Sequence, residues 1–296
     1  MRFLFVDRII ESSPNQWVRG IKNVTLDDDF LTQDKEGRLC FMPSLIGETL
    51  GQLAAWNVMA SCHFTHRPVA GVVSSARLYR PAYLGETVLL ESFIDAVDDK
   101  AVEYHSIARV GQERLFVIEG ALGPLLPMAD FIGQQTVKQQ YEEIFRPGDW
   151  AVLSQQSMPV DILTSLPSRP LLIMAFDRIL DSVPGEYLVA EKRITRSAPY
   201  FPDHFPHKPV LPMTILLECI QNSVSQFVEK SYTTNYEISE LRRIKMNEFV
   251  QPGDVLTCTM KVKAQTENEL ILTCRSEVEG KRVCVVEVVL KAKGFV

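Results

Sequence analysis

Hydrophobic and polar residues alternate along the last part of the chain in a pattern typical of strands. In four segments every second position is apolar, as expected when one face of a sheet is buried. These segments are Ile244–Glu248, Val255–Ala264, Glu269–Val278 and Arg282–Lys291. Upstream of these segments, Thr214–Val228 is apolar on nearly every face and therefore predicts a long buried helix. The chain before this helix is expected to be extended or turned, because it is interrupted by Pro202, Pro206, Pro209 and Pro212.

The first half of the chain repeats the second half. At a constant offset of 170 residues, Asp7–Pro14 aligns with Asp177–Pro184. Each copy has an alternating strand, a proline-marked turn, one long apolar helix and further strands. The repeat predicts two α+β units of ~120 residues each, a common domain size. We expect the first copy at residues 1–123, a connector at 124–158 and the second copy at 159–296.

The run from Tyr200 to Glu218 carries the candidate chemistry. His204 is followed by a proline-stiffened turn and, fourteen positions later, by the carboxylate of Glu218 inside the apolar helix. An imidazole and a carboxylate are the usual partners for moving a proton near neutral pH.

This run resembles the signature of the 3-hydroxyacyl-[acyl carrier protein] dehydratases, in which a His-Phe-Pro turn precedes an apolar stretch and a Glu. The matching positions besides His204 and Glu218 are Phe205, Pro206, Pro209, Val210 and Pro212. The likeness covers most of residues 160–296, and Leu163–Arg178 resembles the amino-terminal helix and first strand of the family. The sequence departs from the family at His207 and Met213, which stand where the family has glycine.

The resemblance implies a hotdog fold, in which an antiparallel sheet wraps one long central helix. With the repeat, the expected fold is a double hotdog of the α+β class. The family builds its sites between two hotdog subunits, so the tandem copy resembles a dimer fused into one chain, and further homo-oligomerisation is left open.

The repeat predicts a composite catalytic site. At the offset of 170 residues, Glu218 aligns with Glu48 and His204 aligns with Asp34, so the first copy keeps the acid and lacks the base. In the resembled family the His of one subunit faces the carboxylate of the other, which pairs His204 with Glu48. Glu218 is the fallback acid and is expected to face the region around Asp34.

A different alignment of the two helices stays open. Placing Pro43 opposite Pro212 puts Thr49, rather than Glu48, opposite Glu218. The ungapped alignment is preferred because Glu48 and Gln52 fit the helix pattern of the family. Glu48 is expected to be buried by its apolar neighbours on the helix.

The resemblance implies the elimination of water from a 3-hydroxyacyl thioester to give a trans-2-enoyl thioester. His204 would be the base, Glu48 or Glu218 the acid, and the backbone N–H of Met213 would bind the thioester carbonyl, with Phe205 and Pro212 also contacting substrate. No metal or redox cofactor is implied, since the phosphopantetheine arm arrives with an acyl carrier protein. The alternatives are a hotdog acyl-thioesterase and a non-catalytic acyl-binding or scaffold protein.

Composition narrows the range of partners. The net charge of −6 at pH 7 argues against a general nucleic-acid-binding role, and no apolar run approaches the ~18–20 residues of a membrane span. The six cysteines show no paired spacing, so we expect reduced core thiols in a cytoplasmic protein.

An acidic carrier protein needs a basic patch on an otherwise acidic surface. Arg242, Arg243 and Lys245 cluster just past the second helix, and Arg77 and Arg80 occupy the matching region of the first copy. We expect the carrier protein to dock at Arg242, Arg243 and Lys245; the alternative is a solvated charged face.

Overall fold

The computed structural model describes residues 3–151 and 171–293 and confirms the expected double hotdog. The main elements of the first half are β1 (Arg8–Ser13), β2 (Trp17–Asn23), α1 (Pro43–Ser61), β6 (Val72–Leu78), β8 (Thr87–Val97), β9 (Ala101–Val110) and β10 (Glu113–Pro127). Those of the second half are β11 (Arg178–Val183), β12 (Tyr187–Arg193), α4 (Met213–Ser231), β13 (Tyr236–Met246), β14 (Val255–Gln265), β15 (Glu269–Val278) and β16 (Lys281–Ala292).

Smaller elements complete the first half. The strands β3 (Leu31–Gln33), β4 (Leu39–Phe41) and β7 (Ala82–Tyr83) form a small sheet, and β5 (His66–Pro68) pairs with the end of β10. The 3-10 helix η1 (Met128–Asp130) and the helix α2 (Gln134–Ile144) follow β10.

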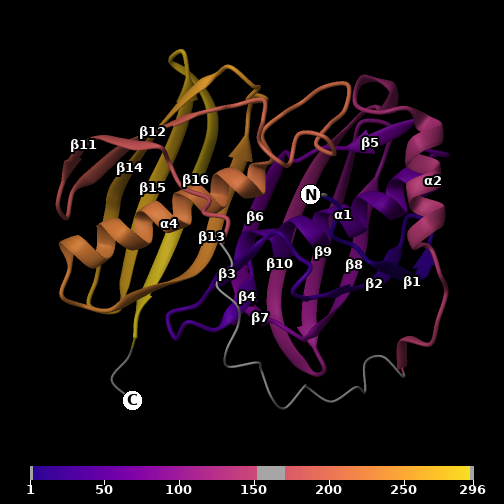
Figure 1. Ribbon diagram of the computed structural model, residues 1–296, viewed down its shortest axis with the longest axis horizontal. Coiled ribbons are helices and arrows are strands. Elements are labelled where there is room, and N and C mark those ends of the chain that lie inside the picture. Colours follow the sequence, from indigo (N-terminus) through magenta and orange to yellow (C-terminus); the bar gives the residue numbers. More distant parts are fainter. Residues whose placement is uncertain (1–2, 152–170, 294–296) are drawn as a thin grey trace.

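One antiparallel sheet runs through both halves. Its order is β1-β2-β8-β9-β10-β6 in the first half and β13-β16-β15-β14-β12-β11 in the second, and the halves join where β6 pairs with β13. Figure 1 shows α1 in front of the first half of this sheet and α4 in front of the second. The two helices also contact each other, so the turn before each helix lies near the helix of the other copy.

The helices fix the alignment of the two copies. α1 begins at Pro43 and α4 at Met213, each has 19 residues, and the two starts are separated by the offset of 170 found in the sequence. Pro43 occupies the first helical turn, where its missing N–H costs no hydrogen bond. The ungapped alignment is therefore confirmed, and the alternative that placed Thr49 opposite Glu218 is wrong.

Most predicted strands agree with the structure, but the central one is longer than expected. β14, β15 and β16 begin within one residue of their predicted starts, whereas β13 begins at Tyr236 rather than at Ile244. Its first part carries charged residues such as Glu237 and Glu240, which hide the apolar alternation. A register shift after Arg242, with φ of +53° at Arg243, interrupts the pattern again.

The segment expected as a connector contributes to the first half in its described part. β10 extends to Pro127, and α2 packs on α1 through Tyr141, whose ring lies 6.1 Å from that of Trp56. The leading helix expected near Leu163 lies outside the described residues. Among the described helices, none is long and apolar enough to cross a bilayer.

Candidate functional site

The turn before α4 holds the ring of His204 in a defined protonation pattern. The backbone N–H of His204 donates to the carbonyl of Tyr200 at 2.9 Å, and the N–H of Val210 donates to the carbonyl of His204 at 3.0 Å. The ring Nδ1 lies 2.9 Å from the carbonyl oxygen of Val210. Because a carbonyl oxygen can only accept, Nδ1 carries the hydrogen, and Nε2 keeps the lone pair that a base needs.

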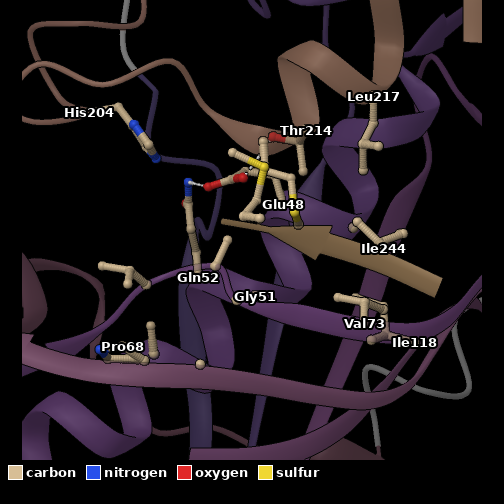
Figure 2. A pocket seen from close by; sticks show the side chains of 18 of the residues that line it. Glu48, Gly51, Gln52, Pro68, Val73, Ile118, His204, Thr214, Leu217 and Ile244 are labelled. Carbon is tan, nitrogen blue, oxygen red and sulfur yellow. Dashed lines mark hydrogen bonds between the residues drawn. The ribbon is translucent and has the colours of Figure 1, made fainter. Parts of the chain in front are cut away.

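Glu48 is held by side chains from both copies. Its Oε2 accepts a 2.7 Å hydrogen bond from the hydroxyl of Thr214 on α4, and its Oε1 accepts a 3.1 Å bond from the amide of Gln52. Gln52 is itself fixed by the backbone of Phe3 and Phe5. Figure 2 shows the His204 ring pointing toward the Glu48 carboxylate and the end of Gln52.

Two features of this arrangement differ from the sequence expectation. Glu48 is half-buried rather than buried, because its carboxylate faces a cavity instead of the apolar core. Thr214 was not recognised as a site residue, since a threonine in the first turn of an apolar helix carries no signal of its own. Its alignment with Ser44 across the repeat could have drawn attention to it.

The cavity has a volume of about 420 Å³ and lies between the two copies. Its wall includes His204, Phe205 and Met213 from the second copy and Glu48 and Gln52 from the first. Along α1 the lining continues through Gly47, Gly51, Ala55 and Met59. These residues recur every four positions and so lie on one helix face, where the glycines leave room for a chain beside the helix.

Pro212, which was expected to contact substrate, does not line the cavity. It is the residue before the first turn of α4. Met213 follows it and does line the cavity, and as the first helical residue it has no intrahelical acceptor for its backbone N–H. This N–H lies at the positive end of the helix dipole.

The surroundings of His204 favour its neutral form. Burial of the ring lowers the pKa of His204 below its ordinary value, and the nearby Glu48 carboxylate opposes this effect in part. A neutral imidazole at neutral pH is the form that can accept a proton. The Glu48 carboxylate therefore acts on His204 across the boundary between the copies.

Glu218 lies in a different environment. It is 6% exposed, does not line the cavity, and accepts a 3.1 Å hydrogen bond from the backbone N–H of Ser44. Burial raises the pKa of Glu218, and the hydrogen bonds from Ser44 reduce the shift. Ser44 aligns with Thr214 at the offset of 170, so each helix start contacts the glutamate of the other helix.

The first copy has an ion pair where the second has its imidazole. Asp34 pairs with Arg38 at 2.7 Å and accepts a 3.0 Å hydrogen bond from the hydroxyl of Tyr83. Burial raises the pKa of Cys40, and the Asp34 and Glu218 carboxylates raise it further, which places Glu218 within electrostatic range of this region. Of the two candidate acids, only Glu48 shares the cavity with His204.

The basic cluster past the second helix is partly neutralised. Arg242 and Arg243 form ion pairs with Glu287 at 2.9 Å and 3.1 Å, and Lys263 pairs with the same carboxylate. Together with Lys245, the two arginines line a separate shallow depression on the sheet. Glu240 lines the same depression, so Glu240 and Glu287 stand against the four cations Arg242, Arg243, Lys245 and Lys263, and a positive excess remains.

The sequence comparisons with known proteins match the second half of the chain, which contains the His204 turn. A FabA-like domain matches residues 166–287. A 3-hydroxyacyl-[acyl-carrier-protein] dehydratase FabZ from Levilactobacillus brevis is 33% identical over 128 residues, which are 42% of this chain and 85% of the relative. FabZ from Halorhodospira halophila is 35% identical over 127 residues, which are 40% of this chain and 82% of the relative.

Solved structures resemble the whole molecule. The 12:0-ACP thioesterase from Umbellularia californica has a TM-score of 0.55 at 12% identity and covers 94% of both chains. A MaoC-like dehydratase has a TM-score of 0.52 at 10% identity, covering 87% of this chain and 85% of the other. At such identities the likeness shows the fold alone.

Proposed function

The chain belongs to the hotdog-fold family of FabZ-type 3-hydroxyacyl-[acyl-carrier-protein] dehydratases, and we propose that it eliminates water from a 3-hydroxyacyl thioester. The observation that carries the proposal is the placement of His204 and Glu48 on one cavity, each from a different copy. The product would be a trans-2-enoyl thioester.

The geometry supports His204 as the base and Glu48 as the acid. Nε2 of His204 would take the proton from C2, because Nδ1 is committed to the carbonyl of Val210. Glu48, in its protonated form, would give its proton to the leaving 3-hydroxyl group. A carboxyl group that accepts one hydrogen bond at each oxygen, from Thr214 and Gln52, still has positions free for that proton.

The negative charge that develops on the thioester oxygen would be stabilised at the start of α4. The free backbone N–H of Met213 can donate to this oxygen, and the helix dipole adds a favourable potential. The side chain at this position replaces the glycine of the family but leaves the N–H in place. A proton passed from His204 back to Glu48 would close the cycle and balance the loss of water.

The acyl group would be delivered by an acyl carrier protein. We propose the cluster of Arg242, Arg243 and Lys245 as its docking surface, because the net charge of the chain is −6 and an acidic partner needs a local positive excess. The pairing with Glu287 weakens this excess, and docking through exposed charges would be sensitive to salt because salt screens them.

The test is to incubate the protein with 3-hydroxyacyl and saturated acyl pantetheine thioesters while measuring enoyl formation and thiol release separately. We expect enoyl product from the first substrate and no thiol from either. His204→Ala should lower the rate of enoyl formation by ~10²–10⁴, the usual contribution of a general base.

A matched control lies on the same turn. His207 is exposed, lies outside the cavity lining, and its ring contacts the carbonyl of Ala129, so His207→Ala should keep the activity. Thiol release without enoyl product would identify a thioesterase instead. Undiminished turnover in His204→Ala would exclude His204 as the base.

A further inference from the structure

Arg67 on β5 places a positive charge in the wall of the cavity. Its guanidinium lies 3.8 Å from the centre of the Phe205 ring and 5.7 Å from that of Phe131. Phe205 in turn stacks on His204 with ring centres 4.1 Å apart. The cation therefore lies close to the reacting groups, on the side of the cavity where the turn of the second copy meets the first copy.

In the part of the chain that the structure describes, the guanidinium has no hydrogen-bond acceptor. Nε of Arg67 is buried without a hydrogen-bond partner, and the side chain forms no ion pair within residues 3–151 and 171–293. Burial lowers the pKa of Arg67 to about 10, against the influence of the Glu48 carboxylate, so the group is still charged at neutral pH. Arg67 as a residue is half-buried, and stacking on Phe205 offsets only part of the desolvation cost of its cation.

A second orphaned donor lines the same cavity. The side-chain nitrogen of Asn247, just after β13, is also buried and has no hydrogen-bond partner among the described residues. The neighbouring Met246 donates its backbone N–H to Gly71 at 2.8 Å, which brings Asn247 beside the segment that follows β5. Phe249 approaches Phe131 with ring centres 6.3 Å apart, so Phe249, two residues after Asn247, and Arg67 both lie against the Phe131 ring.

Buried donors without acceptors are costly, and an arginine with this geometry is well suited to bind a carboxylate through two parallel hydrogen bonds. Lys208 adds a second cation, 5.5 Å from the Phe131 ring and 4.7 Å from the Phe249 ring. An acyl chain that is apolar throughout leaves Nε of Arg67 and the side-chain nitrogen of Asn247 without an acceptor. A chain that ends in a carboxylate supplies the missing acceptor.

We propose that Arg67 and Asn247 form a subsite for a carboxylate on the acyl chain, so that the preferred substrate is a dicarboxylic 3-hydroxyacyl thioester. The part of this inference that concerns the rate of dehydration rests on the proposed dehydratase function. The guanidinium would bind the carboxylate, and the amide of Asn247 would donate one further hydrogen bond.

The kinetic test compares 3-hydroxyglutaryl and 3-hydroxyadipyl pantetheine thioesters with the neutral 3-hydroxyhexanoyl thioester. The wild-type protein should have the higher kcat/KM on one of the acids. Arg67→Met, which keeps an unbranched apolar stem, should lower the ratio of acid to neutral kcat/KM by ~10², because it removes a buried charge partner. Arg67→Lys should restore part of this ratio, and Asn247→Ala should lower it by about tenfold.

A control and a binding measurement separate this inference from the proposed function. Arg114 on β10 is exposed and lies outside the cavity lining, so Arg114→Met should leave the ratio unchanged. Saturated glutaryl and hexanoyl pantetheine thioesters cannot be dehydrated, and their binding by calorimetry should show the same preference and the same loss in Arg67→Met even if no dehydration is found. Wild-type preference for the neutral ligands, or an equal loss for both classes in Arg67→Met, would overturn the subsite.

Discussion

At the scale of single residues, the orientation of His204 depends on contacts that the sequence does not display. The motif predicts a base at this position, but the choice of the basic nitrogen comes from the carbonyl of Val210, six residues later in the turn. Thr214 acts on Glu48 from the other copy, and nothing in its local sequence indicates this. The sequence predicted that His204 and Glu48 lie at one site, as their shared cavity shows, but it did not predict the side chains that orient them.

The lowered pKa of His204 predicts the acid limb of the pH profile. Burial disfavours the charged ring, so a lower pH is needed to protonate it, and the neutral base persists below the ordinary histidine pKa of ~6.5. The kcat/KM for a 3-hydroxyacyl thioester should therefore fall with decreasing pH through an apparent pKa below 6.5. The His207→Ala variant should show the same fall in kcat/KM at low pH. An apparent pKa at or above 6.5 in the wild type would contradict the assignment of His204 as the base.

At the scale of elements, the two central helices were predictable and the central strand was not. The length and start of α4 follow from an uninterrupted apolar segment after four prolines, which gives a strong periodic signal. The start of β13 was missed because this strand lies in the middle of the sheet and pairs with β6 and β16. Its charged residues, such as Glu240, make contacts with the neighbouring copy, including a short hydrogen bond from Ser75, that no local pattern reveals.

The burial of Glu218 on α4 predicts an effect on stability. The raised pKa means that the folded state holds this proton more tightly than the unfolded state does. The resulting stabilisation is complete below about pH 4.5 and is lost as the pH rises through the raised pKa. At pH 8 the buried carboxylate therefore destabilises the fold relative to a neutral group.

Glu218→Gln should remove this pH-dependent penalty while keeping an oxygen that accepts from the N–H of Ser44. We expect the variant to unfold at a higher Tm than the wild type at pH 8, because the folded state then no longer buries a group that tends to ionise. The difference should shrink toward pH 4.5. A lower Tm for the variant, with a gap that widens as the pH rises, would contradict the role given to burial.

At the scale of the whole molecule, the two copies are related by a pseudo-two-fold arrangement that is chemically unequal. Each helix start contacts the glutamate of the other helix, through Thr214 on Glu48 and through Ser44 on Glu218. One of the two equivalent positions carries His204 and opens to the cavity. The other carries Asp34, tied to Arg38 and Tyr83.

The repeat allowed the placement of His204 and Glu48 on one cavity to be predicted from the sequence, because the first copy keeps the carboxylate and lacks the imidazole. The two alignments of the helices could not be separated without their observed starts at Pro43 and Met213. The neutralising role of Glu287 beside Arg242 also escaped prediction, since these residues meet only when β13 pairs with β16. Long-range pairing across a sheet leaves no mark on local sequence.

The most direct test of the account is to compare Glu48→Gln with Glu218→Gln in the dehydration of a 3-hydroxyacyl pantetheine thioester, with folding checked by circular dichroism. The composite site predicts a loss of ~10²–10⁴ in rate for Glu48→Gln and a rate near that of the wild type for Glu218→Gln. If Glu218→Gln is inactive and Glu48→Gln retains its activity, the site lies within the second copy and the pairing of His204 with Glu48 is wrong.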